Sequence, residues 1–218
     1  MDVSGEDVLH ILNGQVMYDE FKRSKKMNSD YAPFNEAMCV NATTKHVFSE
    51  EFIETRALGH NDSVEGYMNK VISPLNHLFN ASYECIVLWF GDDMFCQMNL
   101  LTLLAYLEQS NYKGTVLYNR FREDECEVKQ IELELGHYHT VYADVLLHHS
   151  KPSVTVDPVM HQAIELYFMM LKDDNPVMQY IQEHKHVSTD ELIERLIARF
   201  PTIGYGDVQY KNLINRIK

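Results

Sequence analysis

The sequence has no stretch of roughly 18 uncharged apolar residues, the length that a membrane-spanning helix needs. Its first residues, MDVSGEDVLHILNG, carry acids where a secretory signal is basic, and their apolar run is short. The four cysteines are scattered without a CxxC pair, so their spacing fits neither a disulfide framework nor a zinc site. These absences predict a cytoplasmic protein with no membrane partner. We expect Cys85 and Cys96 to be buried thiols; the other two cysteines are Cys39 and Cys126.

The common signatures of enzymes are also missing. The chain has no GxGxxG or GxxxxGK[ST] motif for a nucleotide, no GxSxG elbow and no HExxH zinc motif. Its 11 histidines include HYH (137–139), HH (148–149) and HKH (184–186), but no further ligands stand at a recognised metal-site spacing. We therefore expect no metal site. Whether the protein is an enzyme, and which cofactor it would use, stay open.

Basic residues are scarce in the first part of the chain. The net charge is −13, and residues 1–150 hold 11 Lys and Arg against 23 Asp and Glu. Residues 151–218 hold 8 basic against 9 acidic residues and are nearly neutral. An acidic body repels nucleic acids and anionic membranes. If any part of this chain contacts DNA, we expect it to be the C-terminal part.

Strands and helices are expected to alternate along the first 150 residues. This alternation predicts an α/β fold with a mainly parallel sheet sandwiched by helices. CIVLWF is apolar at consecutive positions and should be the central strand, whereas EVKQIEL alternates and should lie at an edge. The predicted strands are 8–12, 35–41, 85–90, 114–121 and 127–133. The predicted helices are 16–26, 49–58, 63–79, 94–109 and 138–149, with Ser49 as a cap and Pro74 as a break or kink.

The sequence changes character at SKPSVTVDP, and everything after it has helical spacing. We therefore predict two domains, an α/β domain over 1–150 and an all-α C-terminal appendage over 151–218. The expected helices of the appendage are 159–172, 176–184, 189–199 and 207–217.

Polar turns follow two of the predicted strands, in HILNGQ and in LWFGDD. Ligands of open parallel sheets bind beyond the carboxyl ends of the strands, where a glycine lets the backbone turn and helix amides can bind an anion. The alternative is that the two acids cap a helix and that Glu36 and Arg56 form a structural ion pair. The candidate ligand-binding residues are Asn13, Gly14, Asp92, Asp93 and Gln97, with Glu36 and Arg56 nearby.

The last two predicted helices and the turn between them have the outline of a helix-turn-helix. Their turn is long for that motif and the segment is not basic, so a plain helical hairpin is the favoured interpretation. If the segment does bind DNA, the candidate contacts are Gln209, Lys211, Asn212 and Arg216.

Several motifs occur in an order that resembles an uncharacterised bacterial family of unknown function: LHILNG, NEAMCVN, SEEFIETRA and VLWFGDDMFCQMNLLTLL. AIELYFMMLKDDNP, LIERLIARFP and GYGDVQYKNLI extend the resemblance to nearly the whole chain. Two positions depart from the family pattern, because Gln15 stands where the family usually has Asp and Asp92 where it often has His. The resemblance implies that Asp93 is the family acid, beside the NG turn, and leaves Asp92 as the expected cap. It implies a fold but no reaction, and some members are described as transcription-related.

Three functions stay open from the sequence. The first is binding, with or without turnover, of a small polar or phosphorylated ligand at the strand ends. The second is a DNA-associated transcriptional regulator that reads DNA with its tail. The third is a scaffold or oligomerisation module that forms a homo-oligomer.

Overall fold

The computed structural model describes residues 5–24, 28–121 and 128–217. The chain divides into two compact units, of which the first comprises Met1–Gly91 and Met98–Thr155. The second comprises Asp92–Gln97 and Val156–Lys218. The division near Thr155 lies close to the predicted boundary at residue 150, but the sequence did not indicate that Asp92–Gln97 belongs with the C-terminal helices.

A five-stranded sheet forms the centre of the first unit, with strand order β2-β1-β3-β4-β5. Neighbouring strands are parallel except β4 and β5, which are antiparallel. The expected α/β fold with a mainly parallel sheet and surrounding helices is therefore confirmed. The strands are β1 (Val8–Leu12), β2 (Asp30–Pro33), β3 (Cys85–Gly91), β4 (Thr115–Phe121) and β5 (Val128–Leu133).

The burial of the strands follows their sequence patterns. β3 lies in the middle of the sheet, and Ile86, Val87 and Leu88 are all buried because helices cover both faces. β5 lies at the edge and none of its side chains is buried. Both positions are as predicted, although Glu127, the first residue of the predicted edge strand, lies outside the described residues.

The predicted strand at 35–41 is wrong. The second strand is β2, and the segment after it is an irregular connection with buried side chains at Glu36, Ala37, Met38 and Cys39. Its apolar character reflects this burial. The segment is held by side chains of Arg56 and Asn99 from neighbouring helices, so it needs no strand partner.

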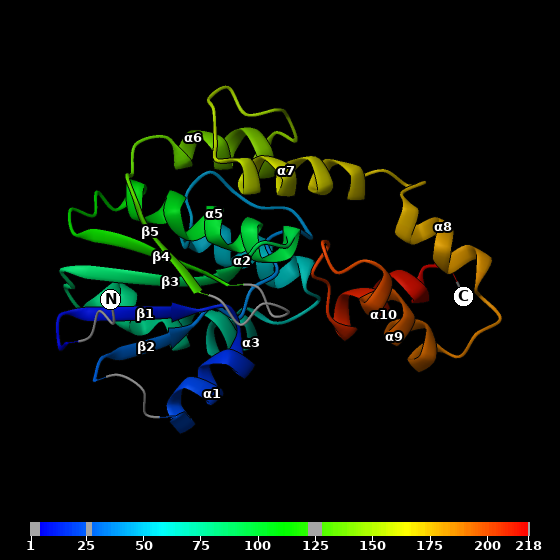
Figure 1. Cartoon of the computed structure of the whole chain (residues 1–218), viewed down its shortest axis with the longest axis horizontal. Coiled ribbons are helices and arrows are strands. Elements are labelled where there is room, and N and C mark those ends of the chain that lie inside the picture. The colour runs from blue at the N-terminus through cyan, green and yellow to red at the C-terminus, as the bar shows by residue number, and fades with distance from the viewer. Residues whose placement is uncertain (1–4, 25–27, 122–127, 218) are drawn as a thin grey trace. The chain divides into compact units, whose positions relative to one another are not determined.

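Helices pack on both faces of the sheet, and Figure 1 shows α1 and α5 on opposite sides of it. The ring centroid of Phe21 in α1 lies 4.8 Å from that of Trp89 in β3. On the other face, the ring centroid of Phe79 in α4 lies 5.6 Å from that of Tyr106 in α5. The helices of this unit are α1 (Gln15–Ser24), α2 (Glu50–Gly59), α3 (Val64–Tyr67), α4 (Asn76–Asn80), α6 (Tyr138–Tyr142) and α5 (Met94–Gln109) from Met98 onward. Residues 25 and 26 of the first predicted helix lie outside the described residues.

The sequence predicted one helix over 63–79, and the structure divides it. A π-helical turn, η1 (Met68–Ile72), and a 3-10 turn, η2 (Ser73–Leu75), separate α3 from α4. Pro74 lies in the 3-10 turn, where it cannot donate the backbone hydrogen bond that a continuous α-helix requires. A second π-helical turn, η3 (Ala143–Leu147), follows α6 in the same way. Ser49 caps α2 as expected, since its side chain accepts a hydrogen bond from the Phe52 amide.

The second unit contains four helices after residue 156, close to the predicted ranges. Side chains of Asp157, Asn175 and Ser188 cap the first three of them. These helices are α7 (Pro158–Met170), α8 (Pro176–Glu183), α9 (Thr189–Arg199) and α10 (Asp207–Asn215). Within the described part of the chain, no helix has the length and apolar character needed to cross a membrane.

Candidate functional site

The β1–α1 turn supplies the first candidate residues, Asn13 and Gly14. Gly14 has a φ of 94°, a left-handed conformation that glycine adopts without strain. The backbone amide of Asn13 donates to the Trp89 carbonyl at 3.2 Å, which holds the turn at the carboxyl end of β3. A Cβ built on Gly14 would have no atom within 4 Å, so the turn is open on that side. The first amides of α1 follow immediately.

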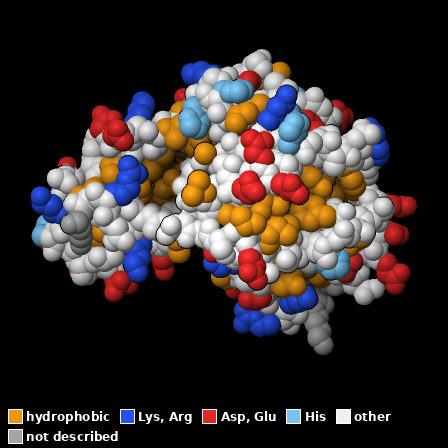
Figure 2. All heavy atoms as spheres, turned by 180° about the vertical axis from the view of Figure 1, so that it is seen from behind, with side chains coloured by type: hydrophobic (Ala, Val, Ile, Leu, Met, Phe, Trp, Pro, Cys, Tyr) orange, Lys and Arg blue, Asp and Glu red, His pale blue; other side chains and the backbone are white. Residues whose placement is uncertain are grey.

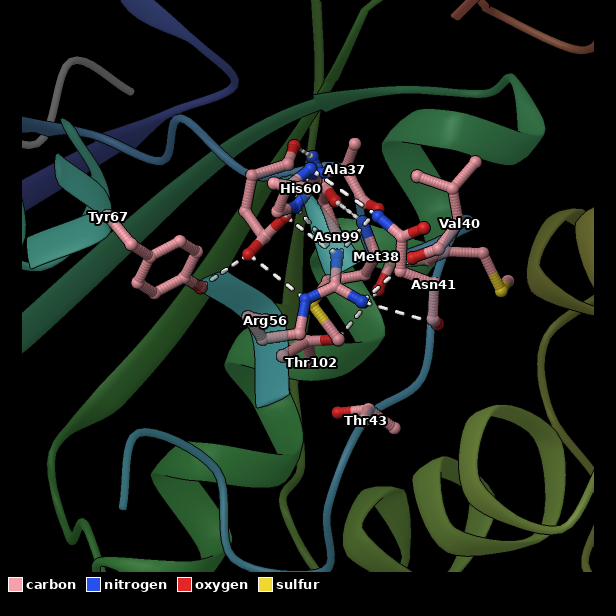
Figure 3. A network of polar contacts seen from close by, with 12 residues as sticks. Ala37, Met38, Val40, Asn41, Thr43, Arg56, His60, Tyr67, Asn99 and Thr102 are labelled. Carbon is pink, nitrogen blue, oxygen red and sulfur yellow. Dashed lines mark hydrogen bonds and ion pairs between the residues drawn. The ribbon is translucent and has the colours of Figure 1, made fainter. Parts of the chain in front are cut away.

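Asn99 joins this turn to the segment after β2. It is fully buried in α5, and its Nδ2 donates to Asn13 Oδ1 at 3.0 Å and to the Glu36 carbonyl at 2.7 Å. Its Oδ1 accepts from the Met38 amide at 2.9 Å. Figure 3 shows Asn99 next to Ala37 and Met38 in this network. Sequence reasoning missed Asn99. The signal that could have indicated it is a side-chain amide within the apolar run of a helix.

Glu36 and Arg56 form a buried ion pair whose side chains are both inaccessible to solvent. Arg56 Nη2 donates to Glu36 Oε1 at 2.8 Å, and Arg56 Nε donates to Oε2 at 3.2 Å. This two-point contact suits the planar guanidinium. Burial by itself would raise the pKa of the Glu36 carboxyl, but the His60 hydrogen bond and the Arg56 charge outweigh burial and hold that pKa well below its usual range.

The remaining donors of Arg56 bind backbone carbonyls. Nη2 donates to Ala37 at 3.0 Å, and Nη1 lies near Val40 at 2.7 Å, Ala42 at 3.1 Å and Asn41 at 3.3 Å. With its donors engaged in this way, Arg56 holds the connection after β2 in place. Of the two roles that the sequence left open for it, the contacts support the structural ion pair.

His60 and Tyr67 complete the network, and sequence reasoning missed both. His60 Nε2 lies 2.6 Å from Glu36 Oε1, and the Tyr67 hydroxyl donates a short hydrogen bond to Glu36 Oε2. Figure 3 shows Tyr67 and Arg56 directed towards the same point. Burial and the Glu36 carboxylate beside it raise the pKa of Tyr67 far above its usual range, so the hydroxyl stays protonated. Arg56 comes from α2, His60 from the C-cap of α2, Tyr67 from α3 and Glu36 from the connection after β2.

The β3–α5 turn carries the adjacent acids, and the expectation that Asp92 is the cap is wrong. Asp93 Oδ1 accepts from the Cys96 amide at 2.8 Å, which is the side-chain bond of a helix N-cap. Asp92 is half-buried and Gln97 is buried. The turn belongs to the second unit, where the Met94 amide donates to the Thr202 carbonyl. That Asp93 lies beside the Asn13–Gly14 turn stays a prediction.

The cysteines near β3 differ in exposure. Cys96 is buried, as expected, whereas Cys85 is half-buried. Burial raises the pKa of the Cys85 thiol, and Glu132 adds to the effect, so this group is not an activated nucleophile. Cys126 lies outside the described residues.

The DNA-contact candidates lie on α10 and at its C-cap, Arg216. Lys211, Asn212 and Arg216 are exposed, whereas Gln209 is half-buried and its Oε1 accepts from the Gly206 amide at 3.2 Å. Gln209 therefore serves its own helix, because its side chain satisfies the N-cap amide of α10; Gly206 has no side chain to return the contact. The DNA-reading role stays a prediction.

Among the described residues, no three His, Cys, Asp or Glu side chains gather in the way that a metal ion would need. Comparison with models of known protein families and with curated proteins finds no match. The resemblance to an uncharacterised bacterial family therefore stays a prediction, and the site has to be interpreted from its own geometry.

Proposed function

We propose that the first unit binds a small polar ligand at the carboxyl ends of β1 and β3. The strand order carries the proposal, because the chain leaves β1 towards β2 on one side and later returns to β3 on the other. Loops diverge at such a reversal, and open α/β sheets bind their ligands there. The Asn13–Gly14 turn lies at the carboxyl end of β1, at this reversal.

The groups at this position suit hydrogen bonding. Asn99 fixes the orientation of the Asn13 carboxamide, so little side-chain entropy is lost when a ligand binds. The first amides of α1, next to the open backbone at Gly14, can donate to a hydroxyl, a carbonyl or a single phosphate. Acidic side chains are spread over the face in Figure 2, and the acidic charge of residues 1–150 disfavours polyphosphates. The proposed ligand therefore carries one phosphate or none.

Backbone NMR tests the proposal. The ¹⁵N-labelled protein is titrated with inorganic phosphate, a nucleoside monophosphate and the matching nucleoside. We expect amide shifts centred on Gln15 and Val16 because these amides would bind the ligand. Shifts with the nucleoside monophosphate but not with the nucleoside would indicate a phosphorylated ligand. Shifts with both would indicate a polar ligand that needs no phosphate.

The matched variants are Asn13→Ala, which removes the carboxamide at the turn, and Asn212→Ala, which removes an exposed carboxamide from α10. We expect Asn13→Ala to weaken binding and Asn212→Ala to leave it unchanged. If all three probes leave the Gln15 and Val16 amides unshifted, binding of this ligand class at the turn is ruled out.

A further inference from the structure

His60 is the surface end of the buried Glu36 network. The side chains of Glu36 and Arg56 have no exposed area, whereas the His60 side chain is 29% exposed. Glu36 already accepts hydrogen bonds from Arg56, Tyr67 and the Ala37 amide, so it does not need His60 to satisfy it. The contact instead orients the imidazole, as a carboxylate does in catalytic carboxylate–histidine pairs.

We propose that His60 and Glu36 form an acid–base pair in which His60 Nδ1 takes a proton from water or from a ligand hydroxyl. The O–H bond breaks, its electron pair stays on the oxygen, and the proton forms a bond to Nδ1. The buried Glu36 carboxylate stabilises the imidazolium, which later returns the proton. The proposal depends on this network alone and does not require the ligand site at β1.

The partners of His60 determine which ring nitrogen carries the proton in the neutral ring. Glu36 is ionised at neutral pH because its pKa is held low, and an ionised carboxylate only accepts hydrogen bonds. The 2.6 Å contact therefore places the hydrogen on His60 Nε2. Arg56 Nη2 lies 3.2 Å from the same nitrogen, but a guanidinium cannot accept a hydrogen bond and does not change this assignment. Nδ1 is left with the basic lone pair.

The surroundings of Nδ1 suit an exchangeable ligand. Asn41 Nδ2 lies 3.4 Å from Nδ1, a long contact made by an exposed residue. Asn41 adopts a left-handed backbone with a φ of 67°, and Arg56 binds the carbonyls on both sides of it. The buried network thus holds the loop in a conformation that places one amide donor beside the basic nitrogen. A ligand hydroxyl can replace that donor without breaking a short hydrogen bond.

Two measurements test the proposal. Long-range ¹H–¹⁵N correlation of ¹⁵N-histidine-labelled protein at neutral pH identifies the tautomer, and we expect the Nε2–H form for His60. Diethyl pyrocarbonate, which acylates an unprotonated imidazole nitrogen, measures the reactivity of Nδ1, with peptide mass spectrometry resolving each histidine. We expect His60 to react several-fold faster than His161, an exposed histidine of α7 that serves as an internal control.

Two variants separate the effect of the Glu36 contact on the His60 ring from the effect of exposing Nδ1. Glu36→Gln should lower the rate for His60 towards that of His161, because the neutral amide no longer stabilises the imidazolium. Asn41→Gly removes the carboxamide, fits the left-handed backbone and keeps Glu36 with its buried partners, so it should raise the rate because it uncovers Nδ1. It also keeps the proposal testable if Glu36→Gln fails to fold. An Nδ1–H tautomer, or equal rates for His60 and His161 in both the wild type and Asn41→Gly, would overturn the proposal. Neither result depends on the ligand titration at β1.

Discussion

Replacing Arg56 with Met tests how strongly the buried ion pair holds the first unit together. Met fills much of the same volume but leaves the Glu36 carboxylate buried without its cation. Both side chains are inaccessible to solvent, so the cost is that of breaking a buried pair, about 3–5 kcal/mol. The carbonyls of Asn41 and Ala42 are on exposed residues, and water can replace their lost contacts. For a domain whose total stability is about 5–15 kcal/mol, the loss should be plain in urea unfolding.

The pH dependence of this loss has a definite sign. The Glu36 pKa in the folded protein lies below its ordinary 4.5, so its contribution to stability is present above that pH. The contribution is lost as the pH falls through the folded value. Removing Arg56 takes away its charge and its hydrogen bonds, which lower the Glu36 pKa, so that pKa is higher than in the wild type and protonation then relieves the buried charge. We therefore expect the difference in stability between wild type and Arg56→Met to shrink as the pH falls from 7 towards 4.5.

Two further variants serve as controls for this prediction. Arg195→Met removes an arginine from an exposed pair with Glu191 and should leave the urea midpoint nearly unchanged. The double variant Glu36→Met/Arg56→Met leaves no unpaired charge and should cost less than the sum of the single variants. A cost of less than about 1 kcal/mol for Arg56→Met at pH 7, typical of surface pairs, would refute the reasoning.

Three other substitutions test local contacts by urea unfolding. Asp93→Ala removes the cap of α5 and should cost about 0.5–2 kcal/mol; a larger loss for Asp92→Ala would restore Asp92 as the cap. Gly204→Ala should cost more than about 1 kcal/mol, since φ there is 73° and the added Cβ would lie 1.9 Å from Asp93 Oδ1. In the double variant Gly204→Ala/Asp93→Ala the added Cβ no longer meets the Asp93 carboxylate, so the loss should be smaller than the sum of the two single losses. Losses that add exactly would contradict the clash. Glu108→Gln should cost up to about 2 kcal/mol because that carboxylate accepts from four successive amides at the start of α6; a similar loss for the exposed Glu134→Gln would contradict this.

The sequence by itself determined the local features. CIVLWF predicted the central strand because a strand covered on both faces must be apolar at consecutive positions. Ser49 predicted a helix start because its hydroxyl can satisfy a backbone amide close by in the sequence. The alternation of strands and helices then indicated the α/β class. Each of these signals acts over a few residues, or repeats with the period of one element.

Only the tertiary structure decided which polar side chains meet. Asn99 and Asn13 are joined across 86 positions of sequence, and Tyr67 reaches Glu36 across 31. No local pattern encodes such distant pairs, because their geometry depends on how several elements pack. Apolar content likewise could not distinguish a strand from the buried connection at 35–41, since both exclude water. The choice between Asp92 and Asp93 as the cap depended on the backbone angles of the turn, and two adjacent identical residues leave those angles undetermined.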